Sequence, residues 1–148
     1  MEKLNVDILE QLNEIRLKTS SDFSAVAYLY KESLMIHWAF ASGNLNERYK
    51  SMQSRPGKGV AGLVIRADRA MILDDSVPNL HVKRLEDPMM CAENLLAAVG
   101  VPVKTLGRTN GVLFVGSREQ KTYTEQDIEM MNELAKNMGG SAEQLKVN

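Results

Sequence analysis

The sequence has a single cysteine, Cys91, among its 148 residues. One thiol forms no disulfide within the chain, and it is too few for a zinc or iron–sulfur site that cysteines hold. The two histidines, His37 and His81, are far apart in the sequence, and no motif brings them together. The sequence therefore predicts a fold that rests on an apolar core, without disulfides and without a metal or other cofactor.

The chain also lacks an excess of either charge, since 18 lysines and arginines stand against 19 aspartates and glutamates. A balanced chain has no strong field for nucleic acid or an anionic membrane surface. Its apolar runs are far shorter than a membrane span, and its N-terminal segment carries acids where a signal peptide has a basic start and an apolar centre. We predict a cytoplasmic protein with no nucleic-acid or membrane partner.

What the chain does have is enough apolar material for one core. Hydrophobic residues make up 44% of it, and no repeat, linker or low-complexity block interrupts it, so we predict one domain over residues 1–148. Apolar residues at helical spacing predict a first helix from Val6 to Leu17. Thr124 and Asp127 form a capping-box pattern, which predicts the start of a last helix with an apolar stripe that reaches Met138.

Two pairs of apolar segments read as β-hairpins. Residues 23–31 and 34–43 are rich in aromatic and branched residues and flank a short polar turn. Strict alternation in the second segment places Trp38 on one face with Phe40, and His37 on the opposite face against the terminal helices. Residues 95–105 and 111–117 form the second pair.

The turn between the strands of that second pair is predicted at Leu106–Asn110, because the pair Asn110-Gly111 suits a turn with positive φ. Between the hairpins we predict a short helix over Val60–Arg66, a strand near residues 70–74 and an irregular connection over 75–93. The fold class is α+β, with a central antiparallel sheet and both terminal helices on one face. The short helix and the connection would enclose a small pocket on the other face.

Three glycines, Gly57, Gly59 and Gly62, crowd into the start of the short helix. The first turn of a helix leaves amides without partners and carries partial positive charge, so the amides of Val60 and Ala61 could hold an anion. The phosphate-loop pattern G-x-x-x-x-G-K-[ST] is absent, which argues against a nucleotide. A turn followed by close packing of the helix on the sheet, with Gly62 at the contact, explains the same glycines without any ligand.

Three stretches resemble the GAF domain family: GKGVAGLVIRADRAMILDD, LLAAVGVPVKTLGRTNGVLFVGS and TEQDIEMMNELA. The resemblance covers essentially the whole chain and implies the GAF fold, in which sensing of small ligands is common and catalysis is rare. Within the family, IHWAFASGNLNERYKSMQSRPGKGVAGLV is similar to the NreA-type nitrate receptors. Those receptors work beside an oxygen-sensing histidine kinase and its response regulator, in the control of nitrate and anaerobic respiration.

The resemblance implies a nitrate site built from main-chain amides at the helix start, a tryptophan of the second strand and residues of the long connection. The matching positions here are Trp38, Val60, Ala61, Pro88, Met89 and Met90, with Gly57, Gly59 and Gly62 as the supporting loop. Nitrate is planar and weakly hydrated, so it loses less on leaving water than phosphate does, and it can pack on an indole face. The implied protein is a receptor and not an enzyme.

Two other functions known among GAF proteins remain open for this sequence. A ligand-free module could form a homodimer, or dock on a kinase, through its terminal helices. A methionine sulfoxide reductase would use Cys91, but such enzymes use several cysteines, and one thiol cannot form the internal disulfide of that cycle. Backbone amides distinguish anions by charge and size more than by chemical structure, so nitrite and chloride stay alternatives to nitrate.

Overall fold

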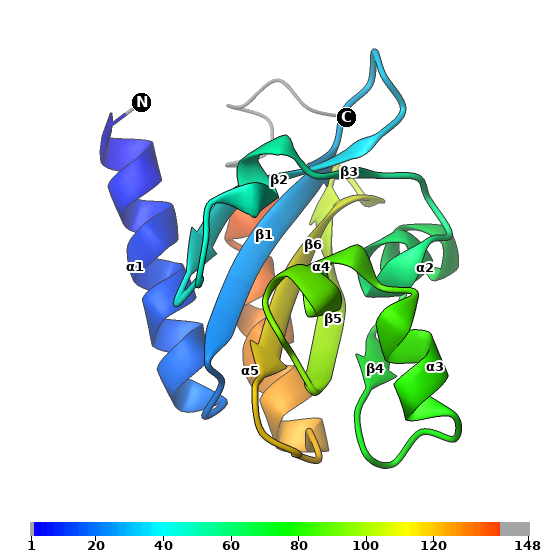
Figure 1. The fold of residues 1–148 in the computed structure, drawn as a ribbon. Coiled ribbons are helices and arrows are strands. Elements are labelled where there is room, and N and C mark those ends of the chain that lie inside the picture. The colour runs from blue at the N-terminus through cyan, green and yellow to red at the C-terminus, as the bar shows by residue number, and fades with distance from the viewer. Residues whose placement is uncertain (1, 140–148) are drawn as a thin grey trace.

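A curved antiparallel sheet separates two layers of helices in the computed structural model, which describes residues 2–139 (Figure 1). The helices are α1 (Glu2–Lys18), α2 (Gly59–Ala67), α3 (Leu80–Leu85), α4 (Pro88–Ala92) and α5 (Glu125–Ala135). The strands are β1 (Phe23–Leu29), β2 (Ile36–Ser42), β3 (Gln53–Ser54), β4 (Met71–Leu73), β5 (Ala97–Thr105) and β6 (Arg108–Ser117). They pair in the order β3-β2-β1-β6-β5-β4, so the predicted α+β class is confirmed.

Each face of the sheet carries its own buried cluster. On one face α1 and α5 cover Val26 and Tyr28 of β1, and on the other α2 and α4 cover Ala25 and Ala27 of the same strand. Alternate residues of a strand point to opposite faces, so one short strand contributes to both clusters. The predicted layers, with both terminal helices on one face, are therefore confirmed (Figure 1).

The terminal helices follow their sequence patterns. In α1 the side chains of Ile8, Leu12 and Ile15 are buried at helical spacing, and Leu17 is exposed. The capping box predicted at the start of α5 is present, because Thr124 accepts a hydrogen bond from the Asp127 amide and Asp127 accepts one from the Thr124 amide. No helix within residues 2–139 combines the length and the apolar character needed to cross a membrane.

A β-bulge in β2 overturns one predicted orientation. Val26 pairs with Phe40 but Ala27 pairs with Trp38, so Ala39 is an extra residue in β2. The bulge reverses the alternation beyond it, and Phe40 packs toward α1 and α5 whereas Trp38 faces α2 and α4. The prediction that Phe40 shares the face of Trp38 is therefore wrong.

His37 lies next to Trp38 in β2 and contacts an aromatic ring. Its ring centroid lies 4.3 Å from that of Tyr30, and its Nε2 lies 3.4 Å from the Ser33 hydroxyl. These contacts tie the first hairpin together near its turn.

The second hairpin turns three residues earlier than Asn110. Thr105 pairs with Arg108, so the turn consists of Leu106 and Gly107, with φ of 53° and 79°. Two consecutive residues with positive φ match the twist of the flanking strands. The turn therefore lies within the predicted segment Leu106–Asn110, but the pair Asn110-Gly111 does not make it, because both residues belong to β6.

Asn110 and Gly111 have other roles in β6. The pairing register shifts there, which leaves Asn110 as a buried bulge residue. A Cβ on Gly111 would lie 2.9 Å from the Ala27 carbonyl oxygen, so the glycine permits close approach of β1. A turn signal in the sequence thus marks a bulge and a crowded strand contact.

The connection over residues 75–93 is more regular than predicted, since it contains α3 and α4. Pro88 occupies the first turn of α4, where its missing amide hydrogen costs nothing, and Asp87 caps that turn. The buried Asp74 holds the start of the connection by accepting hydrogen bonds from the amides of Ser76 and Tyr123, at 2.9 and 2.8 Å. The prediction of an irregular segment failed because Pro88 reads as a helix breaker when its position in the helix is unknown.

Candidate functional site

The loop before α2 turns tightly and folds back on the helix. Gly57 and Gly59 have φ of 95° and 68°, which other residues rarely adopt. The Gly57 amide donates to the Gly62 carbonyl at 2.7 Å, and the Lys58 amide donates to the Arg55 carbonyl at 3.1 Å. The two glycines therefore make the turn at the helix start that the sequence predicted.

Gly62 supports the loop and not the contact with the sheet. A Cβ on Gly62 would lie 2.7 Å from the Arg55 carbonyl oxygen and 2.8 Å from the Gly57 nitrogen. The close approach of α2 to the sheet depends instead on Gly100 in β5, where a Cβ would lie 3.0 Å from the Val60 side chain. The expectation that Gly62 allows helix–sheet packing is wrong, because its open side faces the loop.

We expect Gly62→Ala to lower the free energy of unfolding by about 1–3 kcal/mol, as overpacking commonly does. Glycine to alanine inside a helix normally stabilises it, so the clash with backbone atoms decides the sign here. Urea unfolding measures the change. Leu63→Ala, at an exposed position of the same helix, is the control and should change stability less. A more stable Gly62→Ala protein would contradict this account.

Five of the six predicted contact residues meet in one buried cluster on the α2 face of the sheet. They are Trp38, Val60, Ala61, Met89 and Met90, and none is more than 5% exposed. The Trp38 ring packs edge-to-face on Phe114, with ring centroids 5.3 Å apart. The sixth, Pro88, is exposed and lines a pocket beside Gly59.

That pocket has a volume of about 950 Å³ and opens at the start of α2. Its apolar wall includes Val60, Leu63 and Leu73, and Lys58 and Lys83 stand among its polar residues. Trp38 is not among the lining residues, although it belongs to the same buried cluster as Val60. The pocket and the cluster therefore share Val60 as a common wall.

The sequence reasoning missed Asp87. Its Oδ2 accepts a hydrogen bond from the Val60 amide at 2.9 Å, and its Oδ1 accepts from the amides of Met89 and Met90 at 3.0 and 3.1 Å. The whole Asp87 residue is 3% exposed. An aspartate followed by a proline is a common helix start, and this signal could have identified the cap of α4. The bond to Val60, 27 residues away, has no local signal.

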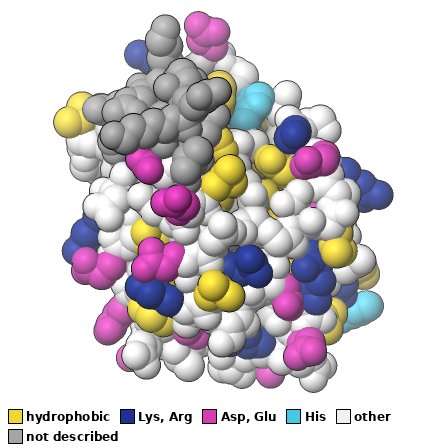
Figure 2. Space-filling view, turned by 90° about the vertical axis from the view of Figure 1, so that its left-hand side faces the viewer, with side chains coloured by type: hydrophobic (Ala, Val, Ile, Leu, Met, Phe, Trp, Pro, Cys, Tyr) yellow, Lys and Arg dark blue, Asp and Glu magenta, His cyan; other side chains and the backbone are white. Residues whose placement is uncertain are grey.

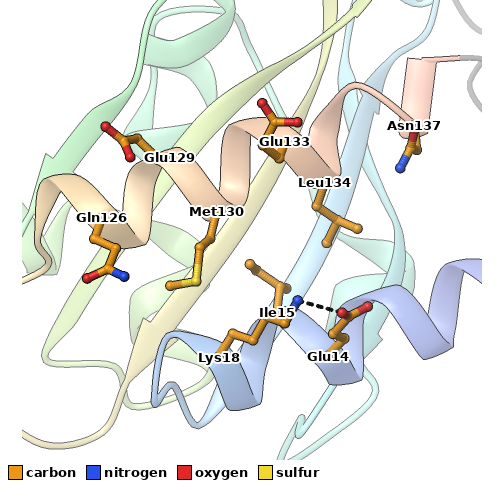
Figure 3. Close-up of a pocket in the computed structure, with 9 residues that line it drawn as sticks. All are labelled: Glu14, Ile15, Lys18, Gln126, Glu129, Met130, Glu133, Leu134 and Asn137. Carbon is orange, nitrogen blue, oxygen red and sulfur yellow. Dashed lines mark ion pairs between the residues drawn. The ribbon is translucent and has the colours of Figure 1, made fainter.

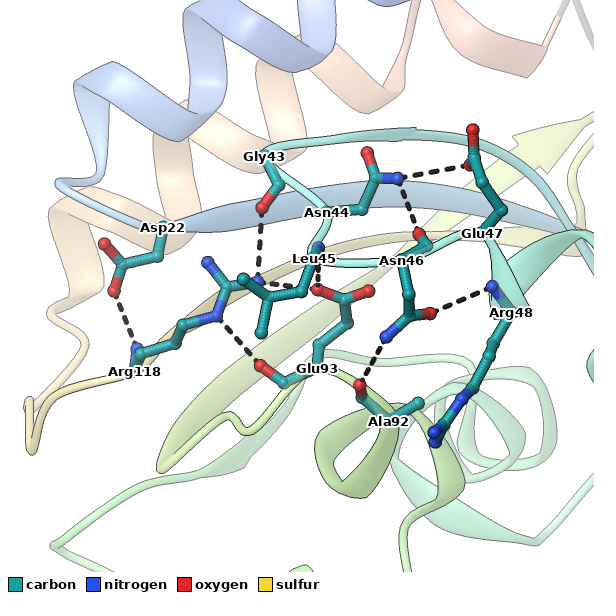
Figure 4. Close-up of polar contacts among 10 residues, drawn as sticks. All are labelled: Asp22, Gly43, Asn44, Leu45, Asn46, Glu47, Arg48, Ala92, Glu93 and Arg118. Carbon is teal, nitrogen blue, oxygen red and sulfur yellow. Dashed lines mark hydrogen bonds and ion pairs between the residues drawn. The ribbon is translucent and has the colours of Figure 1, made fainter.

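The segment SGNLNER, part of the stretch similar to nitrate receptors, fastens the end of α4 (Figure 4). The Leu45 amide donates to Glu93 Oε1 at 2.8 Å, and Asn46 Nδ2 donates to the Ala92 carbonyl at 2.9 Å. Arg118 closes the arrangement from beyond β6, with its Nη2 2.6 Å from Glu93 Oε1 and 3.2 Å from the Gly43 carbonyl oxygen. These contacts position α4 and do not themselves face the pocket.

Two other groups near the site have defined environments. Burial raises the pKa of the Tyr49 phenol, Glu47 raises it further and Lys50 partly offsets this, so the phenol stays neutral at neutral pH. Cys91 is exposed and lies at the pocket wall. Within the part of the chain that the structure describes, no group of three or more histidine, cysteine, aspartate or glutamate side chains could hold a metal ion.

A second hollow lies between α1 and α5, with a volume of about 540 Å³ (Figure 3). Ile15, Met130 and Leu134 form its floor, and three glutamates stand at its edges together with Lys18, which pairs with Glu14 at 2.7 Å. Acidic and basic side chains are interspersed on the face shown in Figure 2. Among the described residues visible on this face, no single-sign patch stands out that would select a charged partner.

Comparison with known proteins supports one family. Residues 1–140 match the GAF domain family. A solved structure of the NreA protein of Staphylococcus aureus, mutated in its nitrate binding site, is 30% identical, with 84% of this chain and 98% of that chain covered and a TM-score of 0.71. A second structure of mutated NreA is 27% identical, with coverage of 80% and 88% and a TM-score of 0.69.

The free methionine-R-sulfoxide reductase of Neisseria meningitidis shares the fold at 19% identity, with 97% of this chain and 81% of that chain covered and a TM-score of 0.74. No curated protein sequence matches the chain. The match over nearly the whole sequence, together with the six-stranded sheet between two helical layers, shows that this chain belongs to the GAF domain family.

Proposed function

We propose that this GAF domain is a nitrate receptor, whose ligand binds at the start of α2. One observation carries the proposal: Trp38, Val60 and Ala61 meet in one buried cluster, in a chain that resembles NreA over most of both sequences. The site that is mutated in those NreA structures is a nitrate binding site, and a site of this composition suits a small, weakly hydrated anion.

The chemistry at the helix start favours such an anion. Val60 and Ala61 stand in the first turn of α2, where amides point out of the helix and the peptide dipoles place partial positive charge. Their side chains are apolar and buried, so water competes little for those donors. The flat Trp38 indole in the same cluster can pack against a planar ion.

The proposal extends to signalling in the cytoplasm. Anion binding would change the arrangement of the connection that contains α3 and α4. A sensor histidine kinase that controls nitrate respiration would bind the surface of this connection and respond to the change. No bond is made or broken in this mechanism. A ligand shifts such an equilibrium only through different affinities for the two forms, so nitrate must alter the hydrogen exchange of residues 75–93.

Isothermal titration calorimetry of the nitrate-free protein tests the proposal, with nitrite, chloride and phosphate as competitors. We expect saturable nitrate binding that the other anions do not match. Ala61→Asp places a second negative charge in the first turn of α2 and should abolish it. Ala67→Asp, at the exposed end of the same helix, is the matched control and should bind as the parent does. Absence of heat and of competition would refute the nitrate receptor.

A ligand-free docking module is the second candidate, and the bond between Asp87 and the Val60 amide favours it, because that amide already has a partner. Such a module would use the hollow between α1 and α5 to contact another copy or a kinase. It predicts partner binding that nitrate does not change. A reductase activity would depend on Cys91, the one cysteine of the chain, and Cys91→Ser would abolish it.

A further inference from the structure

We propose that the Asp87 carboxylate is an internal competitor for the anion site, so that nitrate binds only after this side chain leaves the start of α2. The proposal rests on the function proposed above and adds the residue that regulates it. Asp87 places a full negative charge at the helix start, within 2.9 Å of the amide that the anion would use.

The Asp87 carboxylate accepts hydrogen bonds from the backbone of two helices. Oδ2 accepts from Val60 in α2, and Oδ1 accepts from Met89 and Met90 in α4. Gly59 makes this approach possible, because a Cβ at that position would lie 3.2 Å from Oδ2. Asp87 therefore caps its own short helix and at the same time supplies the charge that the dipole of α2 favours.

Charge repulsion prevents the Asp87 carboxylate and nitrate from occupying the start of α2 at the same time. Asp87 is 3% exposed, and two negative charges a few ångströms apart in such a buried place repel strongly. Nitrate on the Val60 amide must therefore displace the carboxylate and not sit beside it. The apparent affinity for nitrate is the intrinsic affinity multiplied by the fraction of molecules in which Asp87 has already swung away.

Displacement of Asp87 would also affect the connection over residues 75–93, which contains α4. When Asp87 leaves, the amides of Met89 and Met90 lose their acceptor, and the first turn of α4 loses its cap. The far end of α4 stays held, because Asn46 and Glu93 fix it through the contacts of Figure 4. The exchange of one anion for another would thus loosen the start of α4 specifically.

The test compares nitrate titrations of the parent protein and Asp87→Asn. Asparagine keeps an oxygen that can cap α4 but removes the charge, so we expect nitrate to bind at least about tenfold more tightly. Asp74→Asn is the matched control: Asp74 is also buried and also accepts from backbone amides, but its partners are Ser76 and Tyr123. This control should leave the affinity unchanged.

The outcomes separate this inference from the function it rests on. If the parent binds nitrate and Asp87→Asn binds it no more tightly, the inference is overturned and the receptor function stands. If only Asp87→Asn binds, the carboxylate blocks the site permanently, and both the displacement proposed here and the receptor function of the parent are overturned. If neither binds, both are overturned.

Hydrogen exchange in the parent protein provides a second measurement that needs no variant. At saturating nitrate we expect the amides of Met89 and Met90 to exchange faster, while the Val60 amide stays protected by its new acceptor. Unchanged exchange at Met89 and Met90 with nitrate bound would overturn the proposed displacement.

Discussion

Arg118→Ala is expected to lower the free energy of unfolding by about 3–5 kcal/mol, because it leaves the buried Glu93 carboxylate without its partly exposed ion-pair partner. The Glu93 side chain is 1% exposed, and its Oε1 lies 2.6 Å from Arg118 Nη2. Its second oxygen, Oε2, has no hydrogen-bond partner among the described residues, so Arg118 is the main compensation for the buried charge. Without it, only the Leu45 amide still donates to the carboxylate.

Urea unfolding of the variant measures this loss. Glu93→Gln in the Arg118→Ala background removes the stranded charge and should recover part of the stability. Lys18→Ala is the control, since the pair of Lys18 with Glu14 is more than half exposed and such pairs contribute at most about 1 kcal/mol. A loss no larger than that of the control, or no recovery in the double variant, would show that the pair is not a principal support of α4.

Trp38→Ala is expected to lower the free energy of unfolding by about 3–5 kcal/mol and to abolish nitrate binding. The first effect follows from burial, since Trp38 is 5% exposed and packs edge-to-face on Phe114. The second follows from the proposed function, in which the indole forms one wall of the anion site. Calorimetry on the folded variant, at a temperature where it remains native, separates binding from stability.

Phe23→Ala is the matched control for Trp38→Ala. Phe23 is fully buried in the same cluster and also packs edge-to-face on Phe114, with centroids 6.0 Å apart, but it is not one of the predicted contact residues. It should lose similar stability and keep nitrate binding. Nitrate binding by Trp38→Ala at the parent's affinity would leave the tryptophan as a core residue alone, as the ligand-free module requires.

The sequence predicted those features that repeat along the chain. Helical spacing identified α1, and the capping box located the start of α5. Alternation identified the long strands but failed after Ala39, because one extra residue reverses the faces and leaves no mark in the pattern. A second extra residue, Asn110, combined with Gly111 into a convincing turn signal inside a strand.

The candidate site was only partly predictable for a related reason. The spacing of the glycines indicated a tight helix start, and the resemblance pointed to Trp38, Val60 and Ala61, which all belong to the buried cluster on the α2 face of the sheet. Asp87 was missed because its partner Val60 lies in another element, and a contact between side chain and distant backbone has no periodic signature. The contact on which the proposed regulation depends is therefore visible only in three dimensions.

The strand order has a consequence for how the chain folds. The central pairing joins β1 to β6, so that Tyr28 lies beside Gly111. All of the chain between β1 and β6 must close into a loop before these two strands can pair. Closing a long loop costs conformational entropy, and proteins rich in pairings between distant residues fold slowly. During synthesis, the hairpin of β1 and β2 would leave the ribosome with one edge unpaired until β6 follows. The nascent protein is thus most exposed to mispairing with other chains just before its last hairpin is complete.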